Sequence, residues 1–497
     1  MYRVMKICIR QDDELFSWCG NITSKANSLE NAALFRFRNV MTACGKDPAV
    51  WTANERAVMG EVSAAAAKHG LAVPAGKEFF LSYRLLEKTM RDTSSPDFFA
   101  AGLPKQSAQL SLKRVTKRMK GYFAAKSGYK KHPEKFEAMP RLPRYHRSGG
   151  NCTAVLSNQD CVVVREPSGW KVKLPLTKVR VPIGAPAGRL MQAEVIPSHG
   201  IYFLSLTFDD GLKTPEPVST PCRIAAMDIG VDNLASITAN TGVPGLIIKG
   251  GAVKAMNQWY NKRTAAIRSE QTKGGTEKFH PSPESMALDL ERQLCMDDAM
   301  HKTASLIMRW LKSNDIDTFV CGYNPGWKTG SHMGDVNNQN FVQIPFSTLA
   351  RFLEYLCARE GIRFVRQEES YTSKASFIDR DPIPVYNPDS DEEYHFSGHR
   401  RPTRYKGMYK KDGFRGLYVT KEGTIINADL NGSANTGRKA FPDLYTNVCF
   451  DRPYIVSHPD LERTRIITAL IGSVSKSKQR RLKRKQKSIP VGIGLCE

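Results

Sequence analysis

The chain has no continuous apolar stretch of about 18 residues, so we expect no membrane-spanning helix. Its 11 cysteines are scattered, and none forms a C-x-x-C pair, which argues against a structural zinc site and against a disulfide framework. Residues 1–16 lack a long apolar core and a small-residue cleavage site, so we expect no secretory signal. These absences indicate an intracellular protein with reduced thiols and no zinc.

Acidic residues are scarce relative to basic ones. The chain has 49 Asp and Glu against 73 Lys and Arg, which gives a formal net charge of +24. An excess of this size favours a polyanionic partner, with nucleic acid as the first candidate and an anionic membrane surface as the second. A length of 497 residues predicts two to four domains rather than one.

The first half changes pattern twice. Residues 2–10 read as a lone strand, and residues 26 to about 130 show mostly helical spacing of apolar residues. The last helical piece, 112–131, is basic with interleaved aromatics, which suits a phosphate backbone and stacked bases, although a solvated amphipathic face would look the same. Short strands separated by turn signals over 151–215 predict a small β-barrel, which the strand at 2–10 could join.

After residue 222, expected strands alternate with expected helices. Strands are predicted over 317–323 and 362–368, and helices over 253–270, 288–314 and 346–359. Such alternation favours an α/β layer domain built on a mixed sheet. Residues 378–416 read as a polar insertion, and 475–488 form a tail with basic residues and no acidic ones, suited to electrostatic contact with nucleic acid.

Two aspartates stand out in this second half. Asp228 ends an apolar run before a glycine turn, and Asp429 follows a second apolar run. Phosphodiester cleavage by two metal ions needs several carboxylates that converge on ions about 3.5–4 Å apart. A third acid is expected from a neighbouring strand, and Glu368 or Glu369 could supply it, since strand alternation allows only one of them to face the site. Either aspartate could instead be a turn or capping residue.

These patterns resemble TnpB, the RNA-guided nuclease of bacterial insertion sequences, together with its eukaryotic relatives called Fanzor and the type V CRISPR effectors. The matching segments occur in the family's order: PEKFEAMPRLPRY (133–145), MDIGVDNLASI (227–237), KAMNQWYNK (254–262), MHKTASLIMRWL (300–311), GYNPGWK (322–328), NQNFVQIPFSTL (338–349), ESYTSKAS (369–376) and NADLNGSANTGRKA (427–440).

The resemblance implies a multidomain α+β, bilobed architecture. A helical recognition domain, 21–131, would be inserted in an oligonucleotide-binding wedge β-barrel formed by 1–20 and 132–215. An RNase H-like RuvC α/β nuclease domain would comprise 222–376 and 417–445, interrupted by a polar lid or target-nucleic-acid insertion at 377–416. Residues 446–497 would form a C-terminal extension with the basic tail.

The resemblance also assigns catalytic and metal-binding roles. Asp228 matches the first RuvC acid and Asp429 the third, with two Mg²⁺ ions implied and Mn²⁺ as a substitute. Typical members carry the second acid at about Gly322 and have a four-cysteine zinc finger, and this chain has neither. It is similar to a branch, including Fanzor, in which the glutamate has moved to the EESYTSK segment, so Glu369 is the expected second acid and Glu368 the alternative.

Nucleic-acid contacts are expected from basic, aromatic and amide side chains of the matched segments and of the basic helix. They are Lys113, Arg114, Lys117, Arg118, Lys120, Tyr122, Lys130, Arg141, Arg144, Tyr145, Lys254, Asn257, Tyr260, Lys262, Lys328, Lys374, Arg400, Arg401 and Arg404. For the arginines of the insertion, a solvated loop is an equal alternative. Asn435 could hold a metal-bound water or serve in helix capping.

The sequence therefore predicts an RNA-guided, Mg²⁺-dependent DNA endonuclease. Its partners would be a guide RNA, target double-stranded DNA and the RNA–DNA heteroduplex, with one protein per guide RNA favoured and no membrane. One alternative is a guided DNA-binding repressor that does not cleave, and another is a DNA-strand transposase that uses the same acids. Membership of the eukaryotic branch would place the protein in the nucleus, and a bacterial origin in the cytoplasm.

Overall fold

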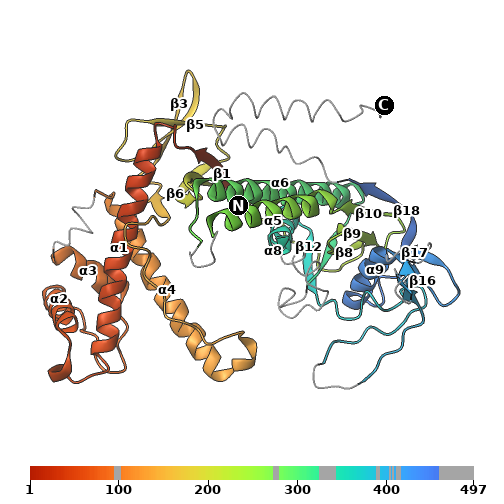
Figure 1. The fold of residues 1–497 in the computed structure, drawn as a ribbon, viewed down its shortest axis with the longest axis horizontal. Coiled ribbons are helices and arrows are strands. Elements are labelled where there is room, and N and C mark those ends of the chain that lie inside the picture. Colours follow the sequence, from red (N-terminus) through yellow and green to blue (C-terminus); the bar gives the residue numbers. More distant parts are fainter. Residues whose placement is uncertain are drawn as a thin grey trace. The chain divides into compact units, whose positions relative to one another are not determined.

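A computed structural model describes residues 1–93, 102–272, 279–323, 343–387, 392–401 and 416–457, and the backbone of 404–405 and 408–409. The chain forms two compact units, residues 1–212 and 213–497, which are described separately (Figure 1). Within the described residues, no helix is long and apolar enough to cross a membrane. The basic tail at 475–488 lies outside the described residues.

Helices of the first unit are α1 (Phe16–Ala43), α2 (Ala53–His69), α3 (Tyr83–Asp92) and α4 (Lys105–Lys131), with short 3-10 turns η1 (Pro48–Val50) and η2 (Pro133–Lys135). Their ends follow from local sequence. Thr52 and Glu55 form a capping box at the start of α2, and Gly70 ends that helix with φ of 60°. Apolar residues at helical spacing, such as Leu29, Phe37 and Leu112, are fully buried between the helices.

Strands of the first unit are β1 (Tyr2–Ile9), β2 (Ala154–Ser157), β3 (Val162–Glu166), β4 (Gly169–Lys173), β5 (Arg180–Ile183), β6 (Arg189–Ser198) and β7 (Ile201–Asp209). They form two antiparallel sheets with orders β1-β7-β6-β2 and β3-β4-β5. The lone first strand does pair with the last one, Tyr2 opposite Asp209. The described strands do not close into the expected barrel, because β1 and β2 are the unpaired edges of one sheet and β3–β5 pair only among themselves.

The second unit is built on a six-stranded mixed sheet, as expected from the alternation of elements. Its order is β12 (Arg363–Gln367), β11 (Thr318–Gly322), β8 (Ile224–Asp228), β9 (Asn233–Ala239), β10 (Pro244–Lys249) and β18 (Cys449–Val456). Strands β8, β9 and β10 form an antiparallel meander. Strand β11 pairs parallel with β8, and β12 pairs parallel with β11. The carboxyl ends of β8, β11 and β12 therefore lie at the same edge.

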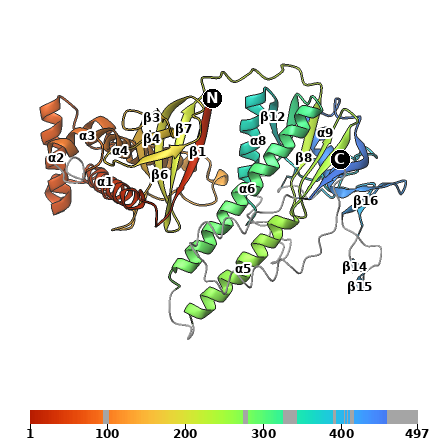
Figure 2. The same cartoon turned by 90° about the horizontal axis from the view of Figure 1, so that it is seen from above.

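Helices cover both faces of this sheet (Figure 2). The side chains of Ala225 and Met227 pack with α5 (Gly251–Gln271), α6 (Pro283–Ser313) and α8 (Phe346–Glu360). Those of Ile224 and Ala226 alternate to the other face and pack with α9 (Ala428–Ala440). A small sheet of β13 (His399–Arg400), β16 (Leu417–Val419) and β17 (Ile425–Asn427) precedes α9. The two-residue strands β14 (Arg404–Tyr405) and β15 (Met408–Tyr409) pair with each other.

Candidate active site

Acidic side chains gather where the parallel strands end. Asp228 is the last residue of β8, and Glu369 lies two residues beyond the end of β12. Between them, β11 ends at Gly322, which pairs with Gln367. Because the three strands are parallel neighbours, their ends deliver Asp228 and Glu369 to opposite sides of Gly322.

Gly322 leaves room for the Glu369 carboxylate because it has no side chain. A Cβ atom at position 322 would overlap the carboxyl group of Glu369. The carboxylate of Glu369 therefore occupies the space into which a side chain at position 322 would extend. Residue 322 has to be glycine for this arrangement, although its backbone conformation is that of an ordinary strand.

Burial and mutual repulsion make two of the acids hard to ionise. Burial raises the pKa of Asp228 to about 7, the negative charge of Asp429 adds to the increase, and the positive charge of Arg400 opposes it. Burial also raises the pKa of Glu369 well above its ordinary value, and the charge of Asp228 adds to this effect. A cation bound among these carboxylates would relieve both penalties.

The third acid is held by α9. Asn427 caps this helix by accepting hydrogen bonds from the backbone N–H groups of Asp429 and Leu430. The Asp429 carboxylate accepts one hydrogen bond from Asn233 at 2.6 Å and one from Arg400 at 3.1 Å. Helix α9 approaches β8 closely through Gly432, where a Cβ atom would lie 2.9 Å from Oδ2 of Asp228.

Glu368 has a different environment from its neighbour. Its carboxylate accepts a hydrogen bond from Lys439 at 2.6 Å and another from the backbone N–H of Ser370. Burial opposes ionisation of Glu368, but the hydrogen bonds from Lys439 and Ser370 outweigh it and lower the pKa. The structure thus brings Glu369 toward Asp228 and engages Glu368 in an ion pair with α9.

Two asparagines of α9 anchor the loop that carries Glu369. Asn435 donates hydrogen bonds to the carbonyl oxygens of Thr372 and Ala375, and Asn431 donates to Ala375. Both asparagine side chains are fully buried. Both amide hydrogens of Asn435 therefore form hydrogen bonds to the loop. This favours a structural role for Asn435 over the predicted alternatives, which were holding a metal-bound water and helix capping.

The residues expected to contact nucleic acid divide into exposed and engaged groups. The exposed ones are Lys113, Lys117, Lys120, Lys130, Arg141, Arg144, Tyr145, Lys262 and Lys374, and the half-buried ones are Tyr122, Lys254, Arg400 and Arg401. Lys328 and the side chain of Arg404 lie outside the described residues. The other predicted residues have partners inside the protein.

Asn257 and Tyr260 belong to this engaged group. Asn257 is completely buried and accepts a hydrogen bond from Arg292, while Tyr260 donates to Asp289 at 2.6 Å. Arg292 also lies over the Tyr260 ring, 5.0 Å from its centre. These contacts connect α5 to α6. The basic pattern of the α5 sequence did not indicate that the Asn257 amide and the Tyr260 phenol face α6.

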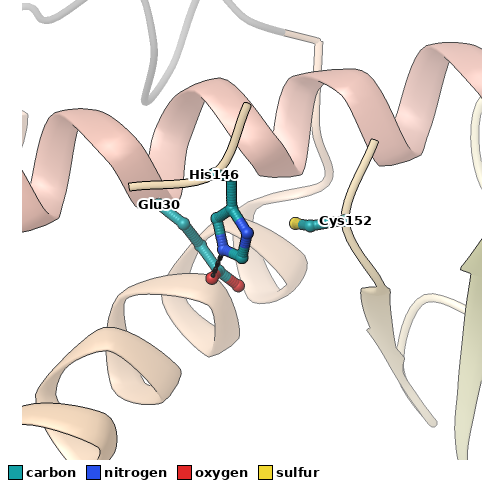
Figure 3. Close-up of side chains that lie close together, drawn as sticks. All are labelled: Glu30, His146 and Cys152. Carbon is teal, nitrogen blue, oxygen red and sulfur yellow. Dashed lines mark hydrogen bonds and ion pairs between the residues drawn. The ribbon is translucent and has the colours of Figure 1, made fainter. Parts of the chain in front are cut away.

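Arg114 and Arg118 are engaged in the first unit, where they surround the buried Glu30. A cluster there contains Glu30, His146 and Cys152 (Figure 3). Each of these residues offers one atom that could bind a metal, and the three atoms lie within 4.8 Å of one another. Arg118 already occupies the position of a cation there, since its guanidinium lies 2.9 Å from Glu30 and 3.1 Å from Nε2 of His146. Burial raises the pKa of Cys152 to about 12, which keeps the thiol protonated. This cluster is therefore an internal ion-pair network.

The pKa of Asp228 predicts how stability depends on pH. In EDTA, Asp228→Asn is expected to stabilise the protein, by a margin that grows from pH 5 to pH 8 and reaches about 2–4 kcal/mol. The folded protein retains a proton between pH 3.8 and about 7 that the unfolded chain has lost, so the wild type loses stability as pH rises through that window. Thermal unfolding at four pH values measures this. Asp232→Asn is the control, because the Asp232 side chain is 82% exposed. A stability difference between Asp228→Asn and the wild type that does not change with pH would contradict the raised pKa of Asp228.

Two known families match parts of the chain. Residues 208–328 match OrfB_IS605, described as a probable transposase, and residues 346–436 match the Cas12f1-like TNB domain. The first range contains Asp228, and the second contains Glu369 and Asp429. The predicted resemblance to TnpB and the type V effectors is confirmed by these two matches.

Solved structures of type V effectors overlap most of the chain at low identity. The Cas12f1–sgRNA–target DNA complex covers 89% of this chain and 100% of its own, with 11% identity and a TM-score of 0.31. CasPhi-2 (Cas12j) bound to crRNA covers 91% and 99%, with 9% identity and a TM-score of 0.34. C2c1 of Alicyclobacillus acidoterrestris with single-guide RNA covers 85% and 70%, with 10% identity and a TM-score of 0.32. No curated protein matches the chain.

Proposed function

We propose that the protein is an RNA-guided, divalent-metal-dependent DNA endonuclease whose catalytic acids are Asp228, Glu369 and Asp429. The observation that carries the proposal is the position of Glu369. Its carboxylate fills the space over Gly322, next to Asp228, where the family resemblance places the missing second acid. A guided repressor without cleavage would have no need for a third carboxylate at this point.

The donor set suits hard divalent cations. All three candidate ligands are carboxylates, which Mg²⁺ and Mn²⁺ prefer, and two of them have pKa values raised by burial and by neighbouring negative charge. Asp228 at the end of β8, Glu369 beyond β12 and Asp429 in the first turn of α9 would hold the metal ions. When bound, the metal ions would supply an activated water and stabilise the leaving oxygen.

Arg400 is the candidate for holding the DNA backbone at this site. Its Nη2 donates to Asp429, and its Nε–H is buried without a hydrogen-bond partner among the described residues. A phosphate oxygen would satisfy this donor, and arginine is well suited to phosphates. The segment before Arg400 is fixed by Asp381, which accepts hydrogen bonds from the backbone N–H groups of Ser376 and Ser397.

The rest of the chain fits a protein that carries a guide. Exposed basic residues of α4 and of 141–145 would hold the RNA, and pairing between guide and target strand would supply sequence specificity, as in other RNA-guided nucleases. The sheet order β10-β9-β8-β11-β12 supports an RNase H-like RuvC domain within 222–376 and 417–445. The proposal includes a recognition domain at 21–131, a wedge at 1–20 and 132–215, an insertion at 377–416 and a C-terminal extension at 446–497. One protein would bind each guide RNA.

Cleavage of a guide-matched plasmid tests the function. Full-length protein purified with its co-expressed RNA is expected to cut a plasmid that carries the matching target beside randomised flanking DNA, in Mg²⁺ but not in EDTA. Cutting should require both the guide match and a short flanking motif. Tight target binding without cutting would favour the repressor, and a preparation that joins DNA strands without bound RNA would favour the transposase.

A further inference from the structure

A β-bulge next to the site aims a lysine at Asn233. Along the β9–β10 pair, Leu246 is opposite Ile237, Ile247 opposite Ser236, and Ile248 opposite Ala235. Regular pairing would then set Lys249 opposite Leu234. The register instead shifts between Ile248 and Lys249, so that Lys249 is opposite Asn233. Since neighbouring residues of a strand point to opposite faces, this shift of one residue changes which side chain of β9 Lys249 meets.

The turn before β9 stabilises this register. The backbone N–H of Gly250 donates a 2.8 Å hydrogen bond to the carbonyl oxygen of Asp232. A Cβ atom at position 250 would collide with the carbonyl oxygen of Val231, so only glycine lets the two backbones approach this closely. The bulge and the glycine thus fix the start of β9 against the end of β10.

The chemistry of lysine determines how the Asn233 amide is oriented. The Nζ of Lys249 lies 2.9 Å from Oδ1 of Asn233, and an ammonium group can only donate hydrogen bonds. The amide oxygen must therefore face Lys249, which turns the NH₂ group toward Asp429. There Nδ2 donates to Oδ2 of Asp429 at 2.6 Å, and the Asn233 residue is only 7% exposed.

We propose that Asn233, oriented by Lys249, is a positioning residue for Asp429, a role that rests on the proposed metal-dependent function. The amide holds one oxygen of the carboxylate without bringing a positive charge into contact with it, because the lysine charge stays one side chain away. The other oxygen is held by Arg400, 3.1 Å away. Asp429 is thereby fixed from the sheet side by a neutral donor that does not compete with a cation.

Direct metal binding tests this role. Binding of Mn²⁺ to the full-length protein, followed by electron paramagnetic resonance, is expected to weaken about tenfold or more in Asn233→Leu and by a similar factor in Lys249→Met, as found for groups that orient metal ligands. The double variant should be no weaker than Asn233→Leu alone, because the lysine acts through the amide. Lys249→Arg keeps a donor and should bind nearly as the wild type does. Lys312→Met, which breaks an exposed ion pair with Glu360, is the control.

Each outcome has a distinct meaning. Unchanged Mn²⁺ binding in Asn233→Leu, or losses that multiply in the double variant, would overturn the positioning role. Thermal unfolding of each variant identifies a loss of Mn²⁺ binding that is caused by misfolding. If Asn233→Leu misfolds, the positioning role is decided by comparing Mn²⁺ binding of Lys249→Arg with that of Lys249→Met, as a matched pair of folded proteins. Wild-type Mn²⁺ binding that survives Asp429→Ala would contradict the proposed function, whereas binding lost with Asp429 and kept without Asn233 contradicts only the positioning role.

Discussion

Replacing Glu369 by glutamine is expected to reduce Mg²⁺-dependent DNA cleavage by about 10³-fold or more, while guide RNA and target binding stay intact. Glutamine keeps the size of the side chain over Gly322 but removes the charge that a metal ion needs. It also removes a carboxylate whose pKa is raised by burial and by the charge of Asp228, so the protein should remain folded. Single-turnover cleavage of a guide-matched target measures the effect.

The neighbouring glutamate provides a matched comparison. Glu368→Gln changes the same functional group one residue away, where the carboxylate pairs with Lys439. It should lower stability modestly and leave the cleavage rate within about threefold of the wild type, since a half-buried ion pair contributes on the order of 1 kcal/mol. A large loss in Glu368→Gln together with a small loss in Glu369→Gln would reverse the assignment of the two residues.

The second prediction moves the acid to another strand. Gly322→Ala alone should reduce cleavage by about 100-fold or more, because its Cβ would displace the Glu369 carboxylate. In Gly322→Asp/Glu369→Ala, the space left by Glu369 is empty and the new aspartate extends into it from β11. This double variant is expected to cleave at least about tenfold faster than Glu369→Ala, because a carboxylate again reaches the metal ions.

An isosteric variant controls for the loss of charge. Gly322→Asn/Glu369→Ala has the same size as the aspartate double variant but no charge, and it should remain as inactive as Glu369→Ala. Equal rates for the aspartate and asparagine double variants would contradict the view that Glu369 replaces an acid at position 322. Thermal unfolding of all variants would show whether the strand end tolerates the new side chain.

The sequence predicted the framework of the second unit well. The helix expected at 346–359 is observed at Phe346–Glu360, and the strand expected at 362–368 at Arg363–Gln367. These elements have strong apolar periodicity and glycine or charge at their ends, which are local properties. The first unit shows the limit of local patterns, because strand spacing predicts strands but not whether they close into a barrel.

The site was predictable only in part for a similar reason. Asp228 and Asp429 follow apolar runs, so their positions at a strand end and a helix start can be derived from sequence. Strand alternation could not choose between Glu368 and Glu369, since β12 ends at Gln367 and the loop beyond it decides which side chain turns inward. Asn233, Lys249 and Lys439 were missed because their roles depend on a register shift and on helix contacts that lie far apart in sequence.

Two of the predicted nucleic-acid contacts also have a partner within the protein that the sequence does not reveal. Arg114 and Arg118 belong to a basic helix, yet both pair with Glu30, whose side chain is completely buried. A carboxylate in α1, more than 80 residues earlier in the chain, is thus the partner of both arginines, whose side chains remain 36% and 34% exposed. The exposed lysines of α4 remain predicted RNA contacts.

The most direct measurement is the location of Mn²⁺ in crystals of the full-length protein by anomalous diffraction. Anomalous peaks are expected between the carboxylates of Asp228, Glu369 and Asp429, and none at the Glu30, His146 and Cys152 cluster. Peaks that contact Glu368 instead of Glu369, or an occupied Glu30 cluster beside an empty carboxylate site, would contradict the proposed metal site.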